Sequence, residues 1–182
     1  MNEKGFEVRL LKPSEAPRLF DFLGNRLKLN SKLKHLGVNL GEYLNKQREG
    51  EWRKLAEEER LFCAVKKSEI IGLGAFGPVQ DALDRTRDST ERKQVILALK
   101  ELGLNPSKVA AFHDLYTTPA ERKQGIATAL IEERLRKATE SGKYSHGVVK
   151  YLANSQSHGL WRKQGAVKLC QAGEHEYGVV KL

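Results

Sequence analysis

The segment 122–127 combines two cations and a glycine at the start of a predicted helix. A helix start leaves backbone N–H groups without intrahelical partners and carries partial positive charge, and both properties favour an anion. Gly125 has no Cβ, so a ligand oxygen can approach the backbone closely, and Arg122 and Lys123 add charged hydrogen-bond donors. The segment therefore predicts a phosphate or pyrophosphate site. The alternative is an ordinary helix start beside a solvated basic loop.

The elements on either side of this segment would hold it in place. Residues 109–116 are rich in apolar and aromatic side chains and predict a strand. Pro119 disfavours further strand, because proline cannot donate to a ladder. Helical spacing begins near Gly125, and one face of the predicted helix carries Ile126, Leu130, Arg134 through its stem, and Ala138.

The wider stretch DLYTTPAERKQGIATALI resembles the acyl-CoA-binding motif of the GNAT superfamily of N-acetyltransferases. Thr117 stands for the usual valine, and Pro119, Arg122, Gly125 and Ala127 are in register. The resemblance implies that acetyl-CoA is the co-substrate and that Arg122 and Lys123 lie beside its pyrophosphate. It further implies that the pyrophosphate binds the backbone of Gln124, Gly125, Ile126 and Ala127, and that the pantetheine arm pairs with the main chain of Leu115, Tyr116 and Thr117.

A second stretch, LANSQSHGLWRKQGAVKL, resembles the second motif of the same family. Its positions are occupied by Asn154, Ser157, Leu160, Trp161, Gly165 and Ala166. The resemblance implies that Asn154 and Trp161 lie near the cofactor. Trp161 replaces the tyrosine that often protonates the departing thiolate, and an indole N–H donates a hydrogen bond but is no acid near neutral pH. Packing is the alternative role for Trp161.

The general base that the family often places on the central strand is missing here. Ala111 stands where many relatives have an acid, and residues 147–152 contain no carboxylate. Strand alternation puts His113 on the face of Ala111, and an imidazole can accept a proton near neutral pH. His113 is therefore the first candidate for the base, and Asp114, on the opposite face, is the second. Structural roles are the alternative for both.

The resemblance implies a single GNAT-like domain over residues 1–182, of the α/β (α+β) class. Its mixed, mostly antiparallel sheet would be splayed at the acyl-CoA cleft and flanked by helices. A helical insertion is expected at about 78–107, where it would fold over the acceptor site, make a homodimer contact, or form a surface helix with neither role. The implied activity is acetyl transfer from acetyl-CoA to a primary amine by direct attack in a ternary complex. The alternative is a non-catalytic acyl-CoA sensor or regulatory module.

Composition sets limits on the other classes of function. The chain has 182 residues, a net charge of +9 and two cysteines. A basic domain is the first indication of nucleic-acid binding, but the Lys and Arg are spread along the chain, which favours a generally basic surface. Cys63 and Cys170 are expected to be free thiols in a reducing cytoplasm. The five histidines lack metal-ligand spacing, and no run of residues predicts a membrane span or a signal peptide.

The remaining pattern predicts the elements around the site. We expect a first strand at 6–11, a helix capped by Ser14, a helix capped by Asn39, and a break near Gly50. Apolar runs at 61–65 and 69–76 predict a hairpin that turns at 67–68. The polar stretch 81–94 predicts a solvated loop, although helical spacing begins at 90 and ends near Gly103. Later strands are expected at 147–152, 167–172 and 177–182.

Overall fold

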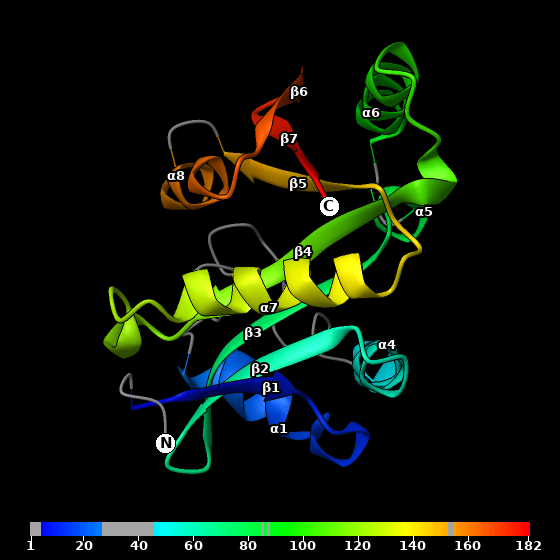
Figure 1. Cartoon of the computed structure of the whole chain (residues 1–182). Helices are drawn as coiled ribbons and strands as arrows, with labels where there is room; N and C mark the ends of the chain where they lie inside the picture. The colour runs from blue at the N-terminus through cyan, green and yellow to red at the C-terminus, as the bar shows by residue number, and fades with distance from the viewer. Residues whose placement is uncertain (1–4, 27–45, 85, 87, 153–154) are drawn as a thin grey trace. The chain divides into compact units, whose positions relative to one another are not determined.

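The computed structural model describes residues 5–26, 46–84, 86, 88–152 and 155–182. Strands and helices are interspersed along the chain, with β2–β3 and β6–β7 as consecutive strands (Figure 1). The strands are β1 (Glu7–Leu10), β2 (Leu61–Lys66), β3 (Glu69–Pro78), β4 (Val109–Thr117), β5 (His146–Leu152), β6 (Val167–Ala172) and β7 (His175–Lys181). The α-helices are α1 (Arg18–Asp21), α4 (Lys46–Glu57), α5 (Val79–Asp84), α6 (Ser89–Glu101), α7 (Ile126–Glu140) and α8 (Gln156–Lys163).

The strands form one mixed sheet in the order β1-β2-β3-β4-β5-β7-β6. Strands β4 and β5 are parallel, from the pair Val109↔His146 to the pair Phe112↔Val149. The ladders β1–β2, β2–β3, β5–β7 and β6–β7 are antiparallel. The mixed, mostly antiparallel sheet flanked by helices confirms the predicted fold class.

The chain forms two compact units. The first unit comprises Met1–Ala75 and Asp114–Arg134, and the second comprises Phe76–His113 and Leu135–Leu182. Strands β3 and β4 and helix α7 each contribute residues to both units. The single-domain organisation over residues 1–182 stays a prediction.

In the first unit, the β2–β3 hairpin separates two packing layers. Lys67 and Ser68 make its turn with left-handed backbone, φ 49° and 66°, which is the conformation that joins two antiparallel strands most tightly. One face of the hairpin, with Leu61, Cys63 and Leu73, packs on buried side chains from α1, the π-helical turn Phe22–Arg26 and α4. The opposite face receives the first turns of α7, because Ile126 and Leu130 lie against Gly72 of β3.

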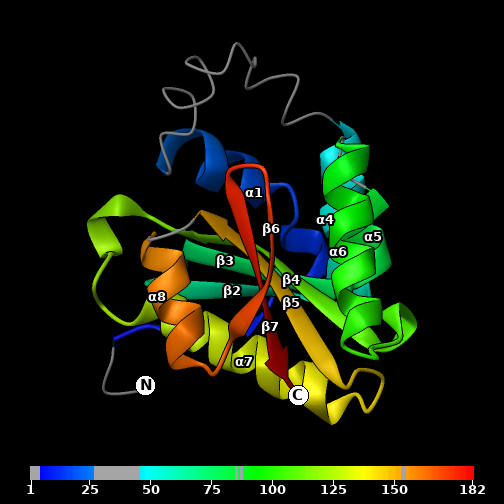
Figure 2. The same cartoon turned by 90° about the horizontal axis from the view of Figure 1, so that it is seen from above.

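In the second unit, helices cover both faces of the strands. Ala111 and Val148 pack against buried residues of α5 and α6. Phe112, which points the other way because strand side chains alternate, packs against Trp161 of α8 with the rings tilted by 48° and their centroids 5.3 Å apart. Figure 2 shows α6 and α8 on either side of β5 and β7. Tyr177 on β7 donates a hydrogen bond of 2.6 Å to Glu91 and so fastens α6 to this part of the sheet.

Two predictions of non-helical structure are wrong: the solvated loop at 81–94 and the helix break near Gly50. Residues 81–94 are largely helical, because α5 ends at Asp84 and α6 begins at Ser89. The Asp88 side chain accepts from the backbone N–H groups of Thr90 and Glu91, an N-cap that starts a helix within a polar sequence. The chain also continues in helical form through Gly50, because burial of Trp52, Leu55 and Ala56 outweighs the ~1 kcal/mol helical cost of a glycine.

The N-terminal caps also differ from the expected ones. The first turn after β1 is a 3-10 helix at Pro13–Glu15, and its N-cap residue is Lys12 rather than Ser14. Glu15 accepts from the Lys12 backbone N–H at 3.1 Å. The helix predicted to begin at Asn39 lies outside the described residues. In the described part of the chain, no helix has both the length and the apolar character that a membrane crossing requires.

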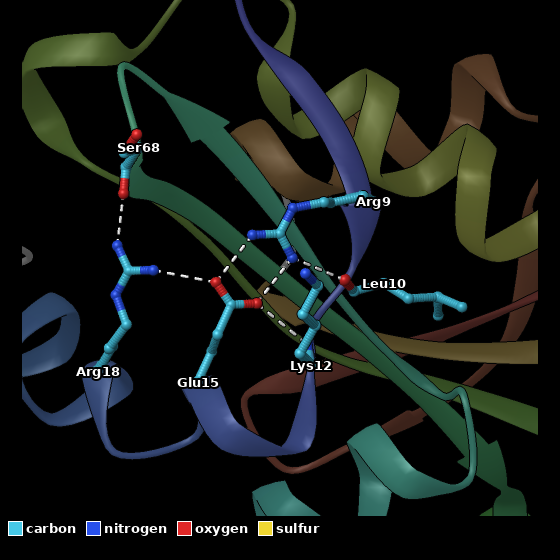
Figure 3. A network of polar contacts seen from close by, with 6 residues as sticks. All are labelled: Arg9, Leu10, Lys12, Glu15, Arg18 and Ser68. Carbon is cyan, nitrogen blue, oxygen red and sulfur yellow. Dashed lines mark hydrogen bonds and ion pairs between the residues drawn. The ribbon is translucent and has the colours of Figure 1, made fainter.

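One carboxylate ties the N-terminal elements together (Figure 3). Glu15 accepts two hydrogen bonds from Arg9 on β1, at 2.7 and 2.8 Å. Arg18 donates to Glu15 at 2.9 Å and also to the Ser68 carbonyl in the β2–β3 turn. The hydrogen bonds from Arg9 are the main cause that lowers the pKa of Glu15 to about 2. The network therefore joins β1, α1 and the hairpin through charge-assisted hydrogen bonds.

We predict that Glu15→Gln lowers the free energy of unfolding by about 2 kcal/mol near neutral pH. The pKa of Glu15 is about 2 in the fold against an ordinary 4.5. Its contribution is thus complete above the ordinary value and is lost as the pH falls through the folded value. Denaturant unfolding of both proteins between neutral and strongly acidic pH should show the difference shrinking over that interval.

The matched control is Glu140→Gln, which removes an exposed pair with Arg136 on α7. Exposed pairs contribute little, so this change should cost under ~0.5 kcal/mol. A Glu15→Gln effect no larger than that of the control would contradict the role of the network.

Candidate functional site

The segment between β4 and α7 is fixed to the β2–β3 hairpin. It begins with the backbone N–H of Thr118, which donates to the Ile71 carbonyl at 3.0 Å. A 3-10 turn follows at Pro119–Glu121, closed by a bond of 3.1 Å from the Glu121 N–H to the Thr118 carbonyl. The strand therefore ends where proline was expected to end it, and the chain reverses direction into α7.

The predicted cation and glycine positions are together on the surface of this segment. Residues 122–125 are exposed, whereas Ile126 is buried against the hairpin. Gly125 has φ 80°, and its carbonyl accepts the 2.9 Å bond from Ala129 that begins α7. A Cβ at Gly125 would meet no atom within 4 Å. Glycine is thus needed here for its backbone conformation, and the space beside it is open to a ligand.

These residues fit a pyrophosphate. The first N–H groups of a helix lack intrahelical acceptors, and α7 begins directly after the open position. Lys123 also has left-handed backbone, with φ 65°, a conformation that non-glycine residues adopt mainly where the surroundings enforce it. We call residues 118–127 the anion loop. Arg122, Lys123, Gln124 and Gly125 lie on its exposed part, and Ala127 is half-buried in the first turn of α7.

An ion pair that sequence analysis missed also supports the anion loop. Lys66, the last residue of β2, donates from Nζ to Oε2 of Glu121 at 2.8 Å. This hydrogen bond is the main cause that lowers the pKa of Glu121. Nothing local in the sequence signals the pair, because the two residues are 55 positions apart.

The sequence predicted that only the aliphatic stem of Arg134 would pack on the apolar face of the helix, but the whole side chain is buried. The side chain has 0% exposure. Its Nε donates to the Leu130 carbonyl and its Nη1 to the Ala75 carbonyl, each at 3.0 Å. Burial lowers the pKa of Arg134 to about 9, and the charge of Asp114 opposes that shift. The other predicted residues of this helical face, Ile126, Leu130 and Ala138, are also buried.

Two glycines of β3 make room for this face of α7. A Cβ at Gly72 would come within 2.9 Å of Ile126, and a Cβ at Gly74 within 2.9 Å of the Arg134 Nε. Glycines inside a strand often mark a bulge or a close approach of another backbone. The structure places side chains of α7 against these two glycines. It also confirms a bulge in β3, because Ala64 pairs with Gly72 and Val65 with Ile70, which leaves Ile71 as the extra residue.

The two candidates for the general base lie at an irregularity in β4. His113 and Asp114 are both partly exposed, and Asp114 has left-handed backbone with φ 54°. Such a residue interrupts a strand, so the predicted alternation from Ala111 to Tyr116 does not continue past His113. Leu115, Tyr116 and Thr117 are partly exposed, and Tyr116 packs against the buried cluster of the first unit.

The second motif forms α8 and the turn after it, in the second unit. Ser155 caps α8 by accepting from the His158 N–H at 3.2 Å, and Gly165, with φ 84°, follows its end. Trp161 is 3% exposed and packs on Phe112. Asn154, predicted to lie near the cofactor, is outside the described residues.

Neither metal nor thiol chemistry has support in the described residues. No group of three His, Cys, Asp or Glu side chains is arranged to hold a metal ion within them. Cys63 and Cys170 are free thiols, as predicted. Cys63 is buried, and burial raises its pKa to about 11, so it is a poor nucleophile near neutral pH. Cys170 is only partly buried.

Comparison with known proteins identifies the family of the chain. The model of the Acetyltransferase (GNAT) family matches residues 35–166, which include both motifs. The chain therefore belongs to the GNAT acetyltransferase family. No curated protein matches the sequence significantly.

Solved structures share the fold across nearly the whole chain. Agmatine N-acetyltransferase is 12% identical with a TM-score of 0.65, and the match covers 98% of this chain and 100% of that one. PaiA N-acetyltransferase from Thermoplasma acidophilum, solved with coenzyme A, is 14% identical with a TM-score of 0.60, covering 97% and 99%. Drosophila melanogaster polyamine N-acetyltransferase is 14% identical with a TM-score of 0.61, covering 97% and 100%.

We predict that Gly74→Ala destabilises the protein by about 1–3 kcal/mol, the usual cost of overpacking a core. The added Cβ would meet the buried Arg134 side chain at 2.9 Å, and that side chain has little room to move. The loss should be smaller in an Arg134→Met background, because the thioether is slimmer than the guanidinium. Denaturant unfolding of the two single variants and the double variant measures this coupling.

Gly50→Ala is the matched control, because a Cβ at that position of α4 would meet no atom within 4 Å. This change should stabilise the protein by ~0.5–1 kcal/mol through helix propensity. Equal losses for Gly74→Ala in both backgrounds would contradict the proposed steric conflict with Arg134.

Proposed function

We propose that this protein is an acetyl-CoA-dependent N-acetyltransferase that acts on a primary amine. The observation that carries the proposal is the anion loop, where a left-handed Gly125 with open space beside it begins α7 next to two exposed cations. Family membership supplies the reaction class. The names of two similar structures refer to agmatine and polyamine acetylation. Agmatine and polyamines both carry a primary amine, which supports an amine acceptor for this protein.

In the proposed complex, the anion loop binds the pyrophosphate of acetyl-CoA. Backbone N–H groups of residues 124–127 donate to phosphate oxygens, and Arg122 and Lys123 add charge-assisted bonds. The main chain of Leu115, Tyr116 and Thr117 pairs with the pantetheine arm as an added strand would. Thr118 N–H is already bonded to the Ile71 carbonyl, so this support does not depend on the ligand.

The proposed reaction is direct attack of the amine nitrogen on the thioester carbonyl within a ternary complex. The C–N bond forms, negative charge develops on the carbonyl oxygen, and the C–S bond then breaks. Backbone N–H groups near Leu115 and Tyr116 would stabilise the oxyanion. His113 would accept the amine proton, with Asp114 as the second candidate. The thiolate would take its proton from solvent, since the indole of Trp161 supplies no acid.

A second function keeps the cofactor site without catalysis. Ala111, at the position where many relatives have an acid, is buried among apolar residues, and the buried Trp161 occupies the usual place of the tyrosine. A sensor or regulatory module that binds acyl-CoA would need neither group. Consumption of acetyl-CoA in the presence of small amines, polyamines, amino acids or protein N-termini separates the enzyme from the sensor.

We predict that Gly125→Glu abolishes binding of CoA and acetyl-CoA, because the side chain would bring bulk and negative charge to the pyrophosphate position. Gly125→Ala is the matched control, since it imposes the same unfavourable positive φ, worth ~1 kcal/mol, without the charge. The alanine variant should retain most of the affinity in calorimetry. Normal CoA binding by a folded glutamate variant would show that the site is elsewhere.

We predict that His113→Ala lowers the rate of acetyl transfer about a hundred- to ten-thousand-fold, the usual contribution of a general base, with little change in CoA affinity. Trp161→Phe serves as the comparison and should keep most of the activity. Wild-type turnover in a folded His113→Ala variant would remove His113 from the mechanism.

A further inference from the structure

The anion loop contains an acid at a place where a negative charge opposes its proposed ligand. Glu121 precedes Arg122 directly and ends the 3-10 turn of the loop. A carboxylate close to a phosphate repels it electrostatically, and this repulsion opposes binding. An exposed, unpaired glutamate would therefore weaken the loop as an anion site.

The structure pairs this acid with a cation from another element. Lys66 Nζ lies 2.8 Å from Glu121 Oε2, and the two side chains are only 33% and 21% exposed. The pKa of Glu121 is lowered, first by the hydrogen bond from Lys66 and also by one from Gln124. Glu121 is thus ionised near neutral pH, and its charge is matched within the hairpin and the loop themselves.

The ion pair also fixes the position of the loop. The β2–β3 hairpin holds it at two points, the Ile71 carbonyl that accepts from the Thr118 N–H and the Lys66 ammonium that binds Glu121. The first contact lies just before the turn Pro119–Glu121, and the second is made by the last residue of that turn. A loop held at both ends of its turn loses less freedom when a ligand binds, and this preorganisation favours affinity.

We propose that Lys66 is a positioning residue for the cofactor site, which neutralises Glu121 and holds the anion loop without contacting the phosphates itself. This inference depends on the proposed acyl-CoA function. It predicts that Lys66 matters to anion binding only through Glu121, so the effect of losing the lysine should depend on whether the glutamate is present.

The experiment measures CoA affinity by calorimetry in four variants at low ionic strength. Lys66→Met should weaken binding about five- to tenfold, because it leaves the Glu121 charge uncompensated beside the site. Glu121→Gln alone removes the repulsive charge, and its amide oxygen can still accept a hydrogen bond from Lys66, so it should bind CoA about as well as the wild type. Lys66→Met with Glu121→Gln should recover most of the affinity lost in Lys66→Met, because only the hold on the loop is then missing. The loss in Lys66→Met should also shrink at high salt, where exposed charges are screened.

Lys67→Met is the matched control, because it removes the same charge one residue away, in the exposed turn of the hairpin. It should change affinity by less than about twofold. Equal effects of the Lys66 and Lys67 changes would overturn the proposal, since only general attraction would then remain. A double variant as weak as Lys66→Met would also overturn it, because Lys66 would then act on the ligand directly.

The same experiment separates this inference from the proposed function. A wild-type protein that binds neither CoA nor acetyl-CoA would contradict the acyl-CoA site itself. Normal wild-type binding with no effect of Lys66→Met would contradict only the role of Lys66. Thermal unfolding of each variant establishes that the affinity differences arise from folded protein.

Discussion

Burial of the Arg134 guanidinium is the constraint on which the arrangement of the first unit depends. A charged group removed from water must be hydrogen-bonded to be tolerated, and here it is bonded to a carbonyl of its own helix and to the Ala75 carbonyl of β3. The fixed length of these bonds sets how closely α7 approaches the strand. Only a residue without a side chain fits at Gly74 under the guanidinium. Because α7 begins at the anion loop, the same bonds set the position of the loop above the hairpin.

The anion loop itself depends on backbone conformation more than on packed volume. Its exposed residues have few neighbours to hold them, and the left-handed backbone at Lys123 and Gly125 turns the chain into α7 within a few residues. Support comes instead from the hairpin, through Ile71 and Lys66. This separation of exposed loop residues from buried supporting residues suits a ligand site. The exposed residues stay accessible, while the residues that hold them belong to a packed layer.

Sequence patterns predicted the elements of the site well and the contacts between them poorly. The strand, the proline turn, the glycine and the apolar face of α7 follow from local rules of spacing and backbone preference. The pairs Lys66–Glu121 and Gly74–Arg134 join residues that are distant in the chain, and no local pattern marks them. The left-handed backbone at Asp114 was missed for another reason, because aspartate carries no obligatory signal for that conformation. Helix α5 was missed because the polar composition of its segment predicted a solvated loop, whereas α6 begins and ends within about two residues of its predicted limits.

The two-residue turn at Lys67 and Ser68 bears on the order in which the site assembles during folding. The β2–β3 hairpin joins neighbouring segments of the chain, and such hairpins form within microseconds. The parallel pairing of β4 with β5 must instead enclose the whole of α7 in its connection, and such non-local pairing is slow. We therefore expect the hairpin to act as an early template on which the β4–α7 segment later docks. In a folding intermediate without α7, the hairpin would already present Lys66, which later holds the anion loop, but the anion loop itself would not yet be formed.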